Sequence, residues 1–235
     1  MSAKRKTVAI IAITVMTLLP GCSGAPAAVE AIQAAKLLIE ALSAADTVVR
    51  LYERYVSESV ERTRRALYED LVLEQMERNR RAADNGQQIL RVRIDLPAIA
   101  LDWENSWRRV EEQTEALEEC LDTIQFRSQV YWTTLGEVAN AIKDDALRAQ
   151  EQIKNLQAKR KWDQAYANAE YQVERARAIC DRGADFHKVL LGSALRSEIS
   201  QQTTTLNLIA TEAEALLKTL ETLTEQGRLL VIGNP

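Results

Sequence analysis

The most reactive side chains in this 235-residue sequence belong to three cysteines and one histidine. Cys22 follows an apolar run and precedes Ser23 and Gly24, so its thiol is placed to act as a nucleophile at the end of a membrane-inserted segment. Cys120 and Cys180 form a candidate disulfide if the protein is exported, because disulfides persist in oxidising compartments. The alternative is that both are free, buried thiols.

His187 lies close in sequence to Cys180 and to two aspartates, which is the outline of a metal site. One histidine and one cysteine do not have the paired spacing of zinc ligands, however. Acidic pairs such as Glu111-Glu112 diverge by about 100° on a helix and do not face each other. We therefore expect no catalytic residues, no metal site and no cofactor.

The first 21 residues have the pattern of a secretory signal. Lys4, Arg5 and Lys6 are basic, and residues 7–19 are uncharged and mostly apolar. At ~1.5 Å per residue this run spans about 20 Å, which is short of the roughly 30 Å hydrocarbon core of a bilayer. We expect residues 1–21 to be a cleaved signal peptide.

The stretch LPGC, residues 19–22, resembles the lipobox of bacterial lipoproteins. The resemblance implies a diacylglycerol on the Cys22 thiol, cleavage just before Cys22 and acylation of the new amino group, so that residues 22–27 form a lipidated tether. It also implies an outer-membrane anchor facing the periplasm, because Ser23 stands where an aspartate would retain the protein in the inner membrane. Ordinary cleavage at the A-x-A-like site of residues 25–27 is the alternative, and it would release a soluble protein.

The composition predicts long helices and an acidic surface. There are only 8 glycines and 4 prolines, which leaves few residues to interrupt a helix. The 30 basic and 34 acidic residues become 27 and 34, a net charge of −7, once the three basic residues of the signal are removed. Phosphate backbones need clustered basic charge, so we expect no nucleic-acid partner.

Basic residues cluster at two places within this acidic chain. One group is Lys159, Arg160 and Lys161, and the other is Arg78, Arg80, Arg81, Arg91 and Arg93. Both groups are compatible with solvated helix faces, or with contact to an acidic partner, peptidoglycan or lipid head groups. If the lipid anchors the start of the first helix, we expect the first group near the bilayer and the second at the far end.

A row of residues spaced alternately four and three apart runs without a break from Trp103 to Ile142. This 3.5-residue period is typical of a coiled-coil-like face that packs against other helices. Shorter rows occur within residues 32–67, 162–180 and 199–223. The sequence therefore predicts an all-α fold with coiled-coil-like packing.

Turn signals divide the mature chain into three long units of similar length. The units are 28–84, 98–160 and 163–227, with boundaries at the DNG of 84–86, at Pro97 and at the KRK of 159–161. Near-equal lengths predict one elongated antiparallel bundle over residues 28–235, with its third helix broken near Gly183 if that glycine ends a helix. A four-helix bundle with an extra turn at 143–145 is the alternative.

These features predict a non-enzymatic, lipid-anchored structural or interaction protein of the cell envelope, such as a periplasmic spacer, an adaptor or a component of a complex. Its expected partners are the membrane, through the anchor, and other envelope proteins or further copies, through the helix rows. One alternative is a membrane-active or pore-forming protein in which residues 27–49 insert. Another is a subunit of a secretion or conjugation machine, whose helical-bundle subunits have a similar shape.

Overall fold

The computed structural model describes residues 25–84, 95–196 and 202–232, and these are almost entirely helical with no strand. The all-α prediction is therefore confirmed for this part of the chain. The helices are α1 (Ala25–Arg64), α2 (Asp70–Asp84), α3 (Leu96–Asn140), α4 (Asp145–Arg196) and α5 (Gln202–Ile232). A π-helical turn, Arg65–Glu69, joins α1 to α2, so one helical run extends from residue 25 to residue 84.

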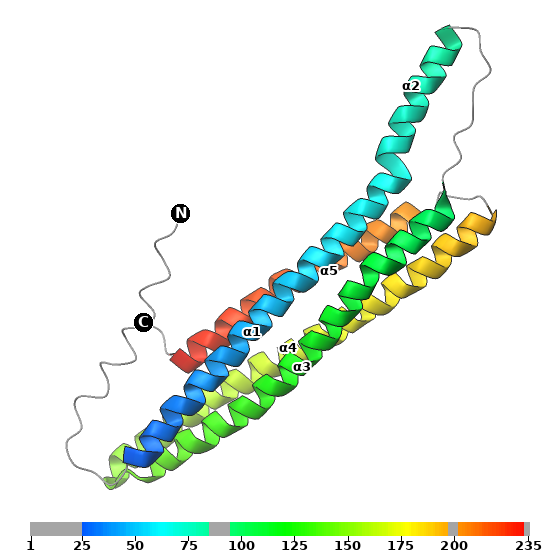
Figure 1. Ribbon diagram of the computed structural model, residues 1–235. Helices are drawn as coiled ribbons and strands as arrows, with labels where there is room; N and C mark the ends of the chain where they lie inside the picture. The colour runs from blue at the N-terminus through cyan, green and yellow to red at the C-terminus, as the bar shows by residue number, and fades with distance from the viewer. Residues whose placement is uncertain (1–24, 85–94, 197–201, 233–235) are drawn as a thin grey trace.

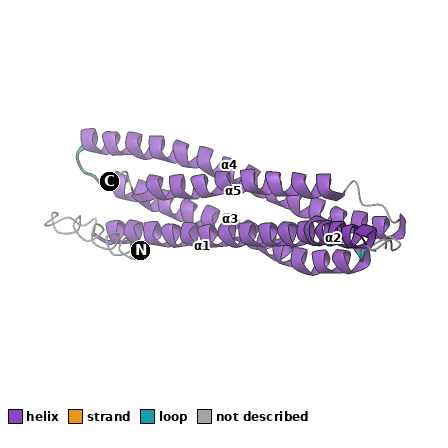
Figure 2. Cartoon of the chain, turned by 90° about the horizontal axis from the view of Figure 1, so that it is seen from above, coloured by secondary structure: helices purple, strands orange, loops and turns teal. Residues whose placement is uncertain are grey.

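The long helices pack side by side (Figures 1 and 2). Helix α3 contacts α1 and α4, and α5 contacts the same two helices. Trp103 Nε1 donates to the Gly183 carbonyl at 2.8 Å, and Asn155 Nδ2 donates to the Leu135 carbonyl at 3.4 Å, so α3 and α4 run antiparallel. Helix α2 extends past the ends of the others (Figure 1).

Helix α5 is too short to cover the bundle along its whole length. Arg64 Nη2 donates to Asn207 at 2.6 Å, and Arg228 Nη2 donates to Ser43 Oγ at 3.4 Å, so α1 and α5 are antiparallel. This register places the last residue of α5 level with about residue 39 of α1. The start of α1, the end of α3 and the start of α4 therefore continue beyond the end of α5 (Figure 1).

Short side chains and a proline define two of the helix starts. Asp95 caps α3 by accepting from the Ala98 backbone N–H at 3.1 Å, and Pro97 occupies the first turn, where its missing N–H costs nothing. Asp144 accepts from the Leu147 N–H at 2.9 Å and caps α4 in the same way. The predicted helix start at Pro97 is thus confirmed to within about one residue.

The three-helix division of the sequence is wrong. The helix predicted over 98–160 ends at Asn140, and the boundary predicted at 159–161 lies inside α4. The turn observed between α3 and α4 is the one that the four-helix alternative required. Helix α4 also passes through Gly183 without a break. Helix α1 begins at Ala25, so the last three residues of the expected tether are helical.

The row of residues that begins at Trp103 faces the core, as its spacing predicted. Every member from Trp103 to Tyr131 is buried except Leu121, which is half-buried. The last members, from Leu135 to Ile142, are only half-buried, because α5 does not extend to this end. The most deeply buried large side chains from the other helices include Tyr52, Phe186, Leu190, Leu206, Ile209 and Leu216.

Candidate functional site

Two tryptophans of α3 form the most specific contact in the core. Trp103 and Trp107, one helical turn apart, stack with ring centroids 4.6 Å apart and an interplanar angle of 15°. Each indole N–H donates to a carbonyl of α4, Trp103 to Gly183 at 2.8 Å and Trp107 to Cys180 at 3.0 Å. Phe186 packs edge-on against Trp103 at 4.8 Å. The pair therefore sets the register of α3 against α4 while leaving no indole donor unpaired.

Gly183 is required by this contact rather than by a helix end. A Cβ atom added at Gly183 would overlap the indole ring of Trp107. Glycine in a helix interior is disfavoured by about 1 kcal/mol relative to alanine, and the close approach of the Trp107 ring accounts for its presence here. The sequence contained the signal, two tryptophans four residues apart and a lone glycine in a helical stretch, but it did not show that they meet.

A second group of polar atoms lies in the core beside the tryptophans. Tyr52 is fully buried, and its Oη has no hydrogen-bond partner among the described residues. Burial, with a smaller effect from the Cys180 thiolate, raises the pKa of Tyr52. Burial also raises the pKa of Cys180 to about 11, against an opposing hydrogen bond with Thr114. Both groups are therefore held in their neutral forms at physiological pH.

The candidate disulfide does not form in the structure, where Cys120 and Cys180 are free thiols. Both lie in the α3–α4 pair but at different levels. Cys180 is level with Trp107, whose N–H it accepts, and Trp107 precedes Cys120 by 13 residues, or about 20 Å along α3. A disulfide requires Cα atoms within about 7 Å. The free-thiol alternative is the one that the structure has.

The half-buried thiol of Cys180 should be poorly reactive. With a pKa of about 11, its thiolate fraction near pH 8 is about two-hundredfold below that of an ordinary cysteine with a pKa near 8.5. We expect iodoacetamide to modify Cys180 correspondingly slowly in the folded protein, with a rate that rises up to about pH 11. Mass spectrometry of each cysteine peptide across this pH range measures the effect, with denatured protein as the control. Equal rates in the folded and denatured protein would contradict the burial of this thiol.

The raised pKa of Cys180 also makes the stability of the folded protein depend on pH. In the unfolded chain the Cys180 thiol loses its proton near pH 8.5, and in the folded chain near 11. Between these values the folded state binds more protons than the unfolded state does. The stabilising contribution of the neutral thiol is therefore present below about pH 8.5 and is lost as the pH rises toward 11.

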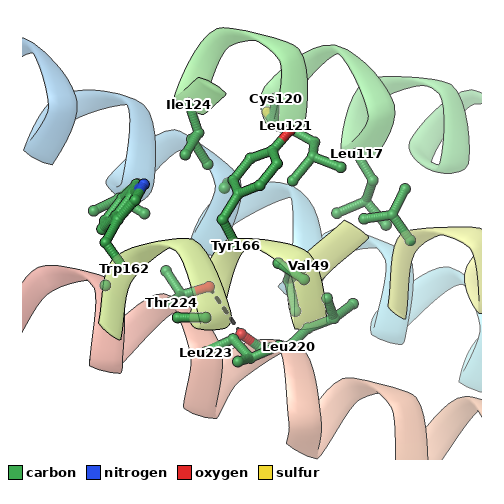
Figure 3. Close-up of a pocket in the computed structure, with 16 residues that line it drawn as sticks. Val49, Leu117, Cys120, Leu121, Ile124, Trp162, Tyr166, Leu220, Leu223 and Thr224 are labelled. Atoms are coloured by element: carbon green, nitrogen blue, oxygen red, sulfur yellow. Dashed lines mark hydrogen bonds between the residues drawn. The ribbon is translucent and has the colours of Figure 1, made fainter. Parts of the chain in front are cut away.

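A small apolar cavity lies between α1, α3, α4 and α5, near Leu42 and Trp162 (Figure 3). Its volume is about 60 Å³. The lining includes alanines at positions 45, 165 and 169, whose small side chains leave this space unfilled. The Thr224 hydroxyl at its wall donates to the Leu220 carbonyl at 2.9 Å and is thus already paired. Ligand pockets usually enclose about 300–1,000 Å³, and engineered cavities that admit benzene about 150 Å³. The cavity is therefore a gap in packing rather than a ligand pocket.

The first basic group lies inside α4 and not at a helix end. Lys159, Arg160 and Lys161 are exposed and begin about 20 Å from the first residue of α4. Lys159 Nζ forms an ion pair with Asp163 at 2.8 Å. The expectation that these residues end a helix is wrong, because α4 begins at Asp145 and continues through them to Arg196.

The second basic group lies partly on the projecting helix. Arg78, Arg80 and Arg81 are exposed on α2, and Arg81 Nη2 lies 3.5 Å from Glu77. Arg91 and Arg93 lie outside the described residues, as does Cys22. The structure thus places the start of α1 and this group at opposite ends of the long helical run.

The single histidine lies beside one carboxylate. His187 is half-buried, and its Nε2 lies 3.9 Å from Glu104 on α3. Across residues 25–84, 95–196 and 202–232, no group of three or more His, Cys, Asp or Glu side chains is arranged to hold a metal ion.

Among the helices in these ranges, none is both long enough and apolar enough to cross a bilayer.

Comparisons of the chain with protein-family models, with curated proteins and with solved structures found no match. Function must therefore be argued from the residues and their arrangement alone.

Proposed function

We propose that the protein is a lipid-anchored interaction protein of the cell envelope. Its anchor is the lipid on Cys22, held in the outer membrane and facing the periplasm, and residues 1–21 are removed as a signal peptide. The support comes from the basic and apolar residues before Cys22 and from the short distance of three residues between Cys22 and the start of α1. The protein is non-enzymatic in this proposal.

The helical part is proposed to be an elongated, antiparallel four-helix bundle made of α1, α3, α4 and α5. The closed order of contacts supports this, since each of these helices contacts two of the others. The longest of them, α4, has 52 residues, or about 78 Å. A bundle of this length separates a membrane anchor at one end from a partner at the other.

The observation that carries the proposal is the continuous helical run from residue 25 to residue 84. Its start lies three residues after Cys22, and its last part, α2, projects beyond the other helices (Figure 1). An isolated 15-residue helix is only marginally stable in water. Because α2 continues the helical run of α1, it presents an already formed helix to a partner. Met76 lies on α2, at the end of the molecule away from the start of α1, and its side chain is 65% exposed.

Site-specific photocrosslinking in a bacterial cell tests this function. A crosslinking amino acid at Met76 should capture an envelope protein, and the full-length protein should fractionate with membranes. The matched control is Tyr171, which is 57% exposed but lies in the middle of the bundle. Recovery of the protein in the cytoplasmic fraction, or equal capture at both positions, would count against the proposal.

A further inference from the structure

The first part of α4 buries no side chain completely. We name Asp145–Lys161 the open segment of α4; all 17 of its residues are described, each is exposed or half-buried, and Trp162 is the first buried residue of the helix. The cause is the short α5, which leaves one side of α4 uncovered at this end. The segment, about 25 Å long, therefore presents an unusually large part of its surface.

Large apolar side chains and cations alternate on the open segment. Leu147, Ile153 and Leu156 are 55%, 56% and 51% exposed. The segment has five basic and two acidic residues, a net charge of +3, although residues 22–235 together carry −7. Clustered lysine and arginine beside exposed apolar side chains favour contact with anionic head groups.

The neighbouring part of α1 extends this apolar surface. Val29 and Ile32 are 51% and 45% exposed, and they lie on the stretch of α1 that continues beyond the end of α5. The start of α1 and the start of α4 meet at the same end of the molecule (Figure 1). This is also the end where the proposed lipid on Cys22 would enter the bilayer.

We propose that the open segment of α4 lies on an anionic membrane surface and forms a second, lipid-independent contact beside the anchor. The inference rests on the proposed envelope location. Its charge matches anionic head groups, whereas the acidic remainder of the protein is repelled by them. Because Lys161 lies about 24 Å from the start of α4, well beyond a Debye length of about 8–10 Å, the bundle must lean on the membrane for these cations to act.

Vesicle cosedimentation of the unlipidated chain, residues 23–235, tests the contact. This chain contains every helix that the structure describes. The vesicles contain phosphatidylglycerol and phosphatidylcholine in equal parts, or phosphatidylcholine alone. We expect binding to the anionic vesicles only, with an affinity that falls as salt is raised from about 0.05 to 0.5 M. The absence of binding would overturn the inference, and because no lipid is attached this result is independent of Cys22 processing.

A cation variant locates the contact. It carries Lys154→Gln, Arg160→Gln and Lys161→Gln. Each basic residue near an anionic surface contributes about a fivefold factor, so the affinity should fall about a hundredfold. The matched control removes the same charge at the far end and carries Arg78→Gln, Arg80→Gln and Arg81→Gln. It should bind within about twofold of the wild type, and an equal loss in both variants would overturn the location.

An apolar variant separates membrane contact from contact with a second copy of the chain. It carries Leu147→Ser, Ile153→Ser and Leu156→Ser; the control carries Leu101→Ser, Val189→Ser and Leu191→Ser. All six side chains are at least 38% exposed, so both variants should fold, which circular dichroism checks. The first should lose at least tenfold in vesicle affinity and the second should not. Loss of self-association in sedimentation, with vesicle binding retained, would overturn the proposal.

Discussion

Trp107→Ala should lower the free energy of unfolding by about 3–5 kcal/mol, the usual cost of removing a large buried aromatic side chain. Trp107 is 2% exposed, stacks on Trp103 and donates to the Cys180 carbonyl. The substitution removes all three contributions and leaves a cavity at the α3–α4 contact. Urea unfolding followed by circular dichroism measures the change. A loss below about 1 kcal/mol would contradict the packing described for this pair.

Gly183→Ala provides a control in which the sign of the effect reverses. In the wild type the added Cβ overlaps the Trp107 ring, and we expect a loss of about 2–3 kcal/mol from overpacking. In the Trp107→Ala background the ring is absent, and alanine should instead stabilise the helix by up to about 1 kcal/mol. A double-mutant cycle measures the coupling. An equal cost in both backgrounds would show that Gly183 is required by the backbone of α4 and not by Trp107.

Cys22→Ser should abolish the proposed lipid attachment and leave a larger precursor. The hydroxyl of serine is a far weaker nucleophile than a thiolate, so no thioether to diacylglycerol forms and the signal is not removed. Each buried methylene of an acyl chain is worth about 0.8 kcal/mol, so the loss of several chains removes the lipid anchor. Incorporation of a labelled fatty acid and the mass of the intact protein measure the outcome.

Cys120→Ser is the matched control for this prediction. It also removes a thiol, but one that is half-buried on α3, and labelling should equal that of the wild type. A Cys22→Ser protein with the native mature mass would exclude the lipoprotein assignment. A mature chain that starts at Ala28 and carries no lipid would instead support cleavage after residue 27.

The sequence predicted the faces of the helices better than their ends. The alternating spacing from Trp103 onward is a property of many residues together, so the buried face of α3 could be read directly. The boundary at 159–161 rested on three basic residues, which suit a helix end but are equally stable on an exposed helix face. Helix α4 continues there because its residues are good helix formers and nothing in the stretch interrupts them.

The true turn between α3 and α4 had a weaker signal. Asp144 caps α4, but Ile153 and Leu156 continue the spacing of the preceding row and so favoured an unbroken helix. In the structure these two side chains are exposed. A spacing pattern indicates which residues share a face of a helix, whereas the length of the neighbouring helix determines whether that face is covered.

The position of Gly183 and the separation of the cysteines depended on tertiary contacts. A lone glycine in a helical stretch is compatible with a helix end, a kink or a close approach, and only the position of Trp107 decides among them. The sequence also did not decide whether Cys120 and Cys180 are close enough to form a disulfide. The distance between them depends on where the turn between α3 and α4 lies.

The contact between α1 and α5 has a consequence for when this protein can fold. Arg64 on α1 and Asn207 on α5 are 143 positions apart in the chain, so α1 packs against a helix that is synthesised much later. Contacts of such long separation form late, since the entropy of closing the loop must be overcome first. One side of α1 therefore stays uncovered until α5 has been synthesised and has folded back onto it, so the bundle is completed only after synthesis has reached α5.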